Sequence, residues 1–357
     1  MADNVFRELQ QRLDTYSLGF PATDSGIELD ILHYLFSEQD AAMFLAITRM
    51  LETPESVAQR LDRPVDEVAA HLEDMARKGL LFRLERGGSV RYGAIPFVHG
   101  LLEFQITRLD KKLAEMVERY MNEGFGEAVV ESADYFLRTI PVQKSIDVTH
   151  NVASYEDACE ILNSRGLIVV TDCICRKRQS LAGQGCGKPL EACFMFGSMA
   201  QYYLDHDMGR RVTPQEAMEI VSKAQKAGLV TQPATAQNPA GMCNCCGDCC
   251  GVLWALNRQL RPAEMVFSNH YAVVNGDVCT GCETCVERCQ MGAISLGEND
   301  VSVVDLDRCI GCGLCVVSCP TEAARLVPKP ADEWRTPPAN SREQMMAMAQ
   351  KRGIQFQ

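Results

Sequence analysis

The chain has 357 residues, 18 of them cysteine, and a formal net charge of −12. The length predicts two to three domains with separate cores, and the charge argues against nonspecific binding to nucleic acid or to anionic membranes. The sequence has no secretory leader and no apolar run of about 18 residues, so we expect a cytoplasmic protein without a membrane span. In that compartment, so many cysteines indicate metal ligation and not disulfide bonds.

Residues 28–95 have the pattern of three helices followed by a hairpin. Thr53 is an N-cap before Pro54 and starts a helix over 55–61. A second helix, over 65–78, has one apolar face and ends at Gly79. Residues 80–92 then read as two strands that turn at Gly87-Gly88. This order of elements resembles a winged helix-turn-helix module.

A winged helix can bind DNA or can serve as a scaffold for protein contacts. Residues 54–92 carry seven basic and seven acidic side chains and therefore have no net charge, whereas phosphate contacts require an excess of lysine and arginine. Arg83, Arg86 and Arg91 on the wing are the best support for DNA. We favour a scaffold for protein contacts or dimerisation and keep DNA binding as the alternative.

The stretch 98–122 repeats apolar residues at helical spacing: Leu102, Ile106, Leu109, Leu113, Met116, Val117 and Tyr120. We expect one long helix here, within a segment 96–140 that acts as a linker or a dimerisation helix. Its apolar face would pack on the preceding module or on the same helix of a second copy.

The next region, 141–270, is predicted as a cysteine-rich α/β domain. Residues 141–148 read as a linker running into an extended segment, 155–163 as a helix and 166–171 as a buried strand. A first cysteine array follows this strand, and its last member falls in a helix predicted to begin near Pro189: Cys173, Cys175, Cys186 and Cys193. The array could enclose a metal centre. Arg176, Lys177 and Arg178 would then offset its charge, or else form a solvated turn.

A second array follows a helix that Thr213 is expected to cap: Cys243, Cys245, Cys246, Cys249 and Cys250. Adjacent cysteines point in different directions along a chain, so Cys245 and Cys246 are expected to serve different centres, unless one of them is spare. With Cys159 set aside as a buried apolar thiol, nine candidate ligands remain. They suffice for two four-ligand sites and one spare cysteine.

The last quarter of the chain repeats a ladder of four cysteines with the spacing Cys-x2-Cys-x2-Cys-x3-Cys. Its members are Cys279, Cys282, Cys285 and Cys289, then Cys309, Cys312, Cys315 and Cys319. With this spacing three thiolates wrap one iron–sulfur cube and the fourth crosses to a neighbouring cube. A zinc ion needs only four thiolates and has no use for the repeat, and four disulfides would need unacceptable geometry. Residues 275–328 therefore resemble a bacterial-type ferredoxin with two [4Fe–4S] clusters.

The resemblance implies that Cys279, Cys282 and Cys285 share one cluster with Cys319, and that Cys309, Cys312 and Cys315 share the other with Cys289. It also implies that Gly281 and Gly311 let backbone N–H groups approach the sulfurs. One departure is visible, because Pro320 follows the second ladder but Gln290 follows the first. We expect only a local change in packing or potential from it.

Together these patterns predict an α+β multidomain protein: a winged helix at 1–95, the linker at 96–140, the cysteine-rich domain at 141–270, a ferredoxin-like 2[4Fe–4S] domain at 271–328 and a tail at 329–357 that packs as a closing helix. The arrangement resembles the 4Fe–4S binding proteins of anaerobes. It implies an iron–sulfur electron-transfer protein or oxidoreductase subunit, more readily than a self-contained enzyme.

The middle domain is expected to hold one or two additional iron–sulfur clusters, with structural zinc or a redox-active dithiol as alternatives. The partners would be redox proteins. A ferredoxin-lobe surface with Asp277, Glu283, Glu287, Asp305 and Asp307 against Arg288 and Arg308 favours a basic patch on the partner. A redox-responsive transcription regulator and a reductase with a catalytic middle-domain cluster remain alternatives. His150, His206 and His270 form no ligand-like pair, and we expect them to be ordinary packing or surface residues.

Overall fold

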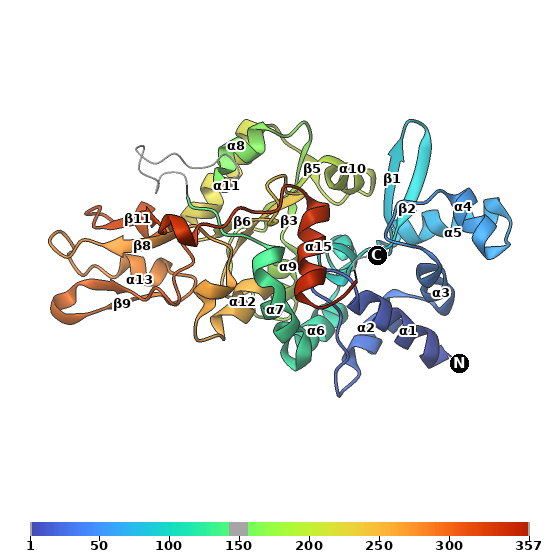
Figure 1. The fold of residues 1–357 in the computed structure, drawn as a ribbon, viewed down its shortest axis with the longest axis horizontal. Helices are drawn as coiled ribbons and strands as arrows, with labels where there is room; N and C mark the ends of the chain where they lie inside the picture. Colours follow the sequence, from blue (N-terminus) through green and yellow to red (C-terminus); the bar gives the residue numbers. More distant parts are fainter. Residues whose placement is uncertain (1, 143–155, 356–357) are drawn as a thin grey trace.

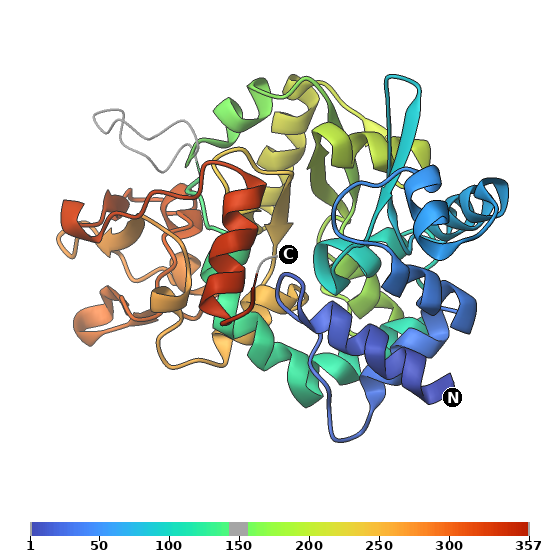
Figure 2. The same cartoon turned by 45° about the vertical axis from the view of Figure 1, so that its right-hand side comes forward.

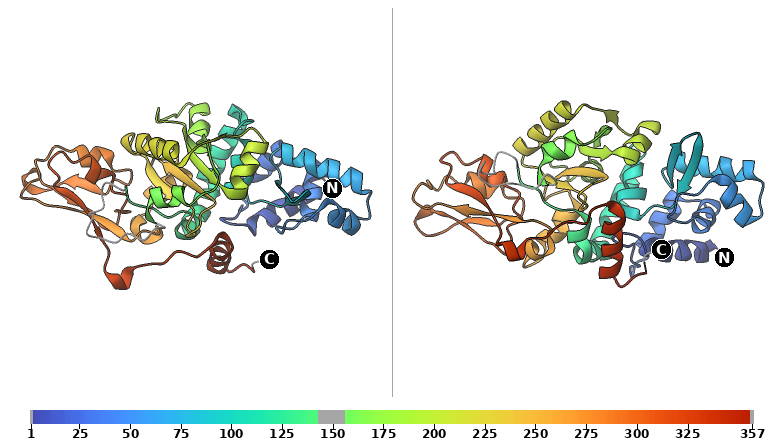
Figure 3. Two further views of the ribbon diagram at one scale, coloured as in Figure 1. Left: turned by 90° about the horizontal axis from the view of Figure 1, so that it is seen from above. Right: turned by 45° about the horizontal axis from the view of Figure 1, so that its top comes forward.

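The computed structural model describes residues 2–142 and 156–355 and arranges them as three regions in a row (Figure 1). Helices and a hairpin from the N-terminal part lie at one end, a five-stranded sheet lies in the middle, and the strands of residues 270–328 form the other end. Seen from above, the last segment runs back along the molecule towards the N-terminal helices (Figure 3). Among the described residues, no helix combines the length and the apolar character needed to cross a membrane.

The N-terminal region is built from α1 (Ala2–Asp14), α2 (Ile27–Leu35), α3 (Glu38–Ala46), α4 (Pro54–Leu61), α5 (Val65–Arg77), β1 (Phe82–Arg86) and β2 (Ser89–Gly93). The predicted start of α4 is confirmed, because Thr53 Oγ1 accepts a hydrogen bond from Ser56 N at 3.4 Å. The hairpin is confirmed too, since Arg86 pairs with Ser89 across the two glycines. The prediction of three helices is one short, because α2 to α5 all precede the hairpin.

The prediction of one long helix over 98–122 is wrong, because the chain bends twice in this stretch. Phe97–Leu101 forms an irregular turn in which His99 has a φ of 57°, and Glu103–Gln105 forms a 3₁₀ turn. Asp110 then caps α6 (Lys111–Tyr120) by accepting a hydrogen bond from Leu113 N at 2.9 Å. A second irregular turn, Met121–Phe125, leads into α7 (Gly126–Phe136). Apart from Met116, which is half-buried, the predicted apolar residues are buried within this chain.

The middle of the molecule is an antiparallel sheet in the order β5-β3-β4-β7-β6. Its elements are α8 (Ala158–Asn163), β3 (Ile168–Asp172), α9 (Ile174–Leu181), β4 (Glu191–Phe196), α10 (Gly197–Asp205), β5 (Arg210–Arg211), α11 (Pro214–Lys226), β6 (Val230–Pro233), β7 (Gly241–Cys245) and α12 (Gly251–Asn257). A buried core of α8, α11 and sheet residues covers one face. The larger core runs without interruption from Phe6 to Met348 and joins the sheet to the N-terminal helices.

The helices and the strand predicted for this region are confirmed, but the predicted position of Cys193 in a helix is wrong. The strand predicted at 166–171 is β3, the helix predicted at 155–163 is α8 with Asp157 as its cap, and Thr213 caps α11. Cys193 lies on strand β4 and not in a helix, because β3 and β7 form hydrogen bonds with β4 on both sides and tertiary pairing overrides local preference. The linker predicted at 141–148 lies outside the described residues from position 143 onwards.

The C-terminal lobe repeats one small unit twice. β8 (His270–Val274) pairs with β11 (Ala324–Pro328), β9 (Ile294–Leu296) pairs with β10 (Ser302–Val304), and the short helices α13 (Thr284–Arg288) and α14 (Leu314–Val317) pack together. The chain then returns to the centre, where α15 (Ser341–Lys351) lies beside α7 (Figure 2). Arg352 donates hydrogen bonds to the carbonyl oxygens of Asp14 (2.8 Å) and Ser17 (3.2 Å). The predicted closing helix is thus confirmed.

Candidate metal centres

The first three cysteines of the first ladder meet the last cysteine of the second. Cys279, Cys282, Cys285 and Cys319 line one small cavity, and we call them the outer set. Cys282 is exposed at the surface. Hydrogen bonds from the Ser302 and Gly281 backbone lower the pKa of Cys279, and contact with the Thr284 hydroxyl lowers the pKa of Cys282. The lowered pKa favours the thiolate form of these two cysteines, and the thiolate is the form that ligates metal.

The remaining four ladder cysteines form an inner set: Cys289, Cys309, Cys312 and Cys315. Each of the last three interacts electrostatically with Cys289, so this cysteine has crossed over to the second ladder. Backbone N–H groups reach the sulfurs, from Ala293 to Cys289 (3.2 Å) and from Ala272 to Cys309 (3.4 Å). Burial raises the pKa of Cys309, Cys312 and Cys315, that of Cys312 to about 12. The inner set is thus the drier of the two.

The two ladder glycines lie where no side chain fits. Gly281 and Gly311 have φ values of +64° and +66°, which L side chains rarely adopt. A Cβ on Gly281 would lie 2.5 Å from the carbonyl oxygen of Asp300, and a Cβ on Gly311 would overlap the carbonyl oxygen of His270. Each glycine therefore lets its cysteine loop lie directly on a neighbouring backbone segment.

Six cysteines of the middle region form a continuous loop of neighbours, which we call the thiol ring. In order around it, the members are Cys175, Cys173, Cys193, Cys243, Cys245 and Cys250. Each thiol interacts electrostatically with the next, and the interaction of Cys250 with Cys175 closes the loop. All six line one cavity of about 90 Å³. Hydrogen bonding lowers the pKa of Cys243, chiefly from Cys193, and that of Cys250, chiefly from Cys245.

Strand register explains how distant cysteines meet in the ring. β4 pairs with β7 so that Phe194 lies opposite Met242, which places Cys193 beside Cys243. Alternate residues of a strand share a face, so Cys245 joins Cys243 on that side. Cys173 and Cys250 occupy the N-cap positions of α9 and α12, where backbone N–H groups favour negative charge.

A buried arginine supplies positive charge beside these sulfurs. Arg176 is 2 % exposed, and its Nη1 donates to the carbonyl oxygen of Asn244 at 2.8 Å. Its Nε and Nη2 have no hydrogen-bond partner within the described part of the chain. Burial lowers the pKa of Arg176, but the cysteines of the ring and Cys246 outweigh this and raise it. Six thiols and a buried cation with free N–H groups fit an anionic iron–sulfur cluster.

Arg176 is thus the basic residue that fulfils the charge-offset expectation most directly. Lys177 Nζ instead donates to the carbonyl oxygen of Ile106 at 2.6 Å, and Arg178 pairs with Glu118 at 2.5 Å. Contact with Cys173 and burial raise the pKa of Cys175, and Arg178 offsets this rise only in part.

The other three middle cysteines form a separate group, the three-thiol set: Cys186, Cys246 and Cys249. Their sulfurs lie within 4.8 Å of one another. The predicted grouping of Cys186 with Cys173, Cys175 and Cys193 is therefore wrong, and nine cysteines divide into six and three. Cys245 and Cys246 do fall into different sets, as their adjacency predicts. Cys159 belongs to neither set, but it is half-buried on α8 beside Asn163 and not fully buried as predicted.

His99 and Glu103 line the ring cavity, and sequence patterns gave no signal for either. His99 combines a positive φ with a depressed pKa, because the surrounding protein desolvates its imidazole. Glu103 accepts a hydrogen bond from Gly100 N at 3.0 Å, and burial raises its pKa. Of the histidines predicted to be ordinary, His206 stacks on Tyr202 and His270 is buried in β8, while His150 lies outside the described residues.

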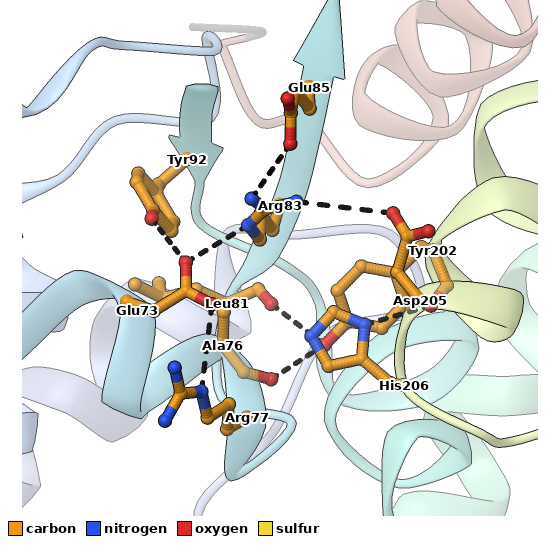
Figure 4. Close-up of polar contacts among 10 residues, drawn as sticks. All are labelled: Glu73, Ala76, Arg77, Leu81, Arg83, Glu85, Tyr92, Tyr202, Asp205 and His206. Carbon is orange, nitrogen blue, oxygen red and sulfur yellow. Dashed lines mark hydrogen bonds and ion pairs between the residues drawn. The ribbon is translucent and has the colours of Figure 1, made fainter. Parts of the chain in front are cut away.

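Helix α5 and the hairpin that follows it contact α10, as Figure 4 shows. Tyr202 Oη lies 3.0 Å from the carbonyl oxygens of both Ala76 and Leu81. Arg83 pairs with Glu73 at 2.9 Å and with Glu85 at 3.0 Å, and it lies 3.9 Å from Asp205. Arg83, one of the three wing arginines expected to support DNA binding, is therefore paired with carboxylates.

The ferredoxin lobe docks on the sheet through the residue that departs from the ladder pattern. Gln290 Oε1 accepts a hydrogen bond from Gly247 N at 2.8 Å, and its backbone oxygen accepts one from Asn257 at 2.9 Å. Arg308 donates to the carbonyl oxygens of Met291, Gln259 and Asn257. Glutamine at this position thus provides an interdomain contact that proline could not make.

Residues 272–326 match the family model described as "4Fe-4S dicluster domain". No curated protein and no solved structure matches the chain. The family match supports iron–sulfur clusters in the C-terminal lobe, and the cysteine-rich middle region lies outside it.

Proposed function

We propose that the chain is an iron–sulfur electron-transfer protein in which the outer and inner sets each hold a [4Fe–4S] cluster and the thiol ring holds a further iron–sulfur centre. Such groups supply reversible one-electron transfer when bound. The docking of Gln290 carries the proposal, because this residue follows inner-set Cys289 and hydrogen-bonds Gly247, two residues beyond ring member Cys245. Few bonds therefore separate the inner set from the ring.

The position of each set supports an order of transfer. The outer set has the exposed Cys282 and would face partners, whereas the inner set is less exposed within the lobe. The ring lines a cavity whose opposite wall is formed by the bends at 97–106 and 121–125 and by α6 and α7. Backbone N–H groups and Arg176 stabilise negative charge at the sulfurs, and the apolar wall around the ring excludes water.

The surface around the outer set favours a partner with a basic patch. The lobe has eight exposed acidic residues: Asp277, Glu283, Glu287, Glu298, Asp300, Asp305, Asp307 and Glu322. Among these, Asp307 pairs with Arg261 at 2.9 Å. The guanidinium groups of Arg288 and Arg308 are turned away from these carboxylates and donate to backbone carbonyls at the ends of α11 and α12. Encounter with a basic redox partner would be fast and sensitive to salt.

The proposal also assigns a role to the N-terminal region. The helices and the hairpin over 1–95 form a winged-helix scaffold for protein contacts, including a homodimer, with DNA binding disfavoured by the pairing of Arg83. The protein acts in the cytoplasm as the electron-transfer component of an oxidoreductase.

The test is the iron and acid-labile sulfide content of anaerobically purified protein. Two clusters account for about eight irons per chain, so the wild type should exceed this value. Cys193→Ser and Cys243→Ser should lower the iron to about eight while the EPR signal of the reduced ferredoxin lobe persists. Cys159→Ser is the matched control and should change neither quantity. A wild type with only about eight irons would refute the ring centre.

A further inference from the structure

The three-thiol set is built from two segments far apart in the sequence. Cys186 lies in the loop between α9 and β4, while Cys246 and Cys249 lie in the turn between β7 and α12. The sulfurs of Cys186 and Cys246 are 3.8 Å apart, and all three sulfurs lie within 4.8 Å of one another. Cys246 and Cys249 are buried, and Cys186 is half-buried. The loop before β4 and the turn after β7 thus bring their cysteine sulfurs into contact with one another.

The spacing distinguishes this set from the other cysteines. A tetrahedral ion with metal–sulfur bonds of about 2.3 Å places neighbouring sulfurs about 3.8 Å apart. In the described part of the chain, no three of the ferredoxin-lobe or ring cysteines lie within 4.8 Å of one another. The ring encloses a cavity, whereas the three-thiol set closes around a single point.

We propose that Cys186, Cys246 and Cys249 bind one thiophilic divalent metal ion, Zn²⁺, separately from the iron–sulfur centres. Thiolate ligands select such an ion over magnesium or calcium, and the fourth position is left to a ligand outside the three thiols. Two cations offset the charge of the thiolates, because Arg176 and Lys188 both interact electrostatically with Cys246. Lys188 also pairs with Asp248 at 3.0 Å across the same two segments.

The ion would fasten the Cys186 loop to the turn that receives the ferredoxin lobe. Gly247, whose N–H binds Gln290, lies between Cys246 and Cys249. The metal would therefore stabilise the contact on which the inner set docks, and it would carry no electrons itself because Zn²⁺ has no redox chemistry.

The test measures zinc and iron together in the full chain purified anaerobically. We expect about one zinc per wild-type chain, lost in Cys186→Ser and in Cys249→Ser while iron and sulfide stay unchanged. Cys159→Ser should retain both metals. Loss of iron and sulfide from Cys186→Ser, with zinc absent from the wild type, would overturn the proposal and assign this set to a cluster.

A second measurement needs no variant. Wild-type protein produced with Co²⁺ in place of zinc should show the visible bands of tetrahedral cobalt and thiolate-to-cobalt charge transfer. These should stand out in a difference spectrum against the zinc form. Absence of cobalt from the protein, or of these bands, would refute the site even if the variants do not fold. The iron content of ring variants tests the proposed function independently, so the two failures are distinguishable.

Discussion

The close approach of the second ladder to β8 makes Gly311→Ala a demanding test of the cluster loops. Gly311 has a φ of +66°, and a Cβ there would overlap the carbonyl oxygen of His270 and lie 2.7 Å from Ser268 Oγ. The left-handed conformation costs an L residue about 1–2 kcal/mol, and overpacking against backbone adds about 1–3 kcal/mol. Because Cys309 and Cys312 flank the glycine, relief of the clash would displace inner-set sulfurs.

Gly292→Ala is the matched control, because Gly292 also follows a ladder cysteine and has a φ of +58°, but nothing lies within 4 Å of its Cβ position. It should lose only the conformational cost of about 1–2 kcal/mol. Anaerobic denaturant unfolding gives the free energies, and visible absorbance reports cluster content. Gly311→Ala should lose more stability than the control and lose inner-set absorbance. Equal losses in both variants would refute the close approach.

Three further predictions concern stability and electron flow. Burial raises the pKa of Glu73, but hydrogen bonds from Tyr92 and Arg83 outweigh this effect and lower the pKa. The ionised Glu73 carboxylate therefore stabilises the fold above its unfolded pKa of about 4.3. This stabilisation is lost as the pH falls through the folded pKa. Glu73→Gln should therefore cost about 1 kcal/mol at neutral pH in denaturant unfolding and little in acid; a cost independent of pH would contradict the assignment. Gln290→Ala removes the acceptor for Gly247 N and should slow reduction of the ring centre in stopped-flow experiments. Gln290→Glu keeps an acceptor oxygen and should preserve the rate of reduction. Equal rates in all three forms would exclude this hydrogen bond from the electron-transfer path. The outer cluster should have the higher reduction potential in an EPR-monitored titration, because hydrogen bonds and solvent favour the added negative charge, and the reverse order would show that burial does not set the difference.

The ladders could be predicted because their information is local. Spacing within each ladder indicates that its first three thiols can share a cube, and the resemblance to two-cluster ferredoxins implies the exchange of the fourth. The structure brings the expected groups together. The division of the middle cysteines depends on contacts that spacing does not encode. Cys193 meets Cys243 only through the register of β4 and β7, and Cys186 reaches Cys246 across 60 positions of sequence.

The break in the predicted long helix has a similar origin. Leu102, Ile106 and Leu113 keep helical spacing and are buried, so periodicity reports their burial correctly. The capping carboxylate of Asp110 and the positive φ of His99 interrupt the predicted helix. Neither feature changes the spacing of the apolar residues, so the spacing could not reveal them. The ring cavity occupies the space beside these bends, and a continuous helix would run past it.

The return of the last segment across the molecule has a consequence for the order of folding. Arg352 reaches Asp14 over 338 positions of sequence, and Lys351 reaches Asp134 over 217. Such distant contacts form late, since their loop-closure entropy is lost before the contact can stabilise the chain. The segment 329–355 can pack on α7 and on the N-terminal part only after the C-terminal lobe that precedes it has been synthesised. We therefore expect the packing of α15 on α7, which brings the two ends of the chain together, to be one of the last steps of folding.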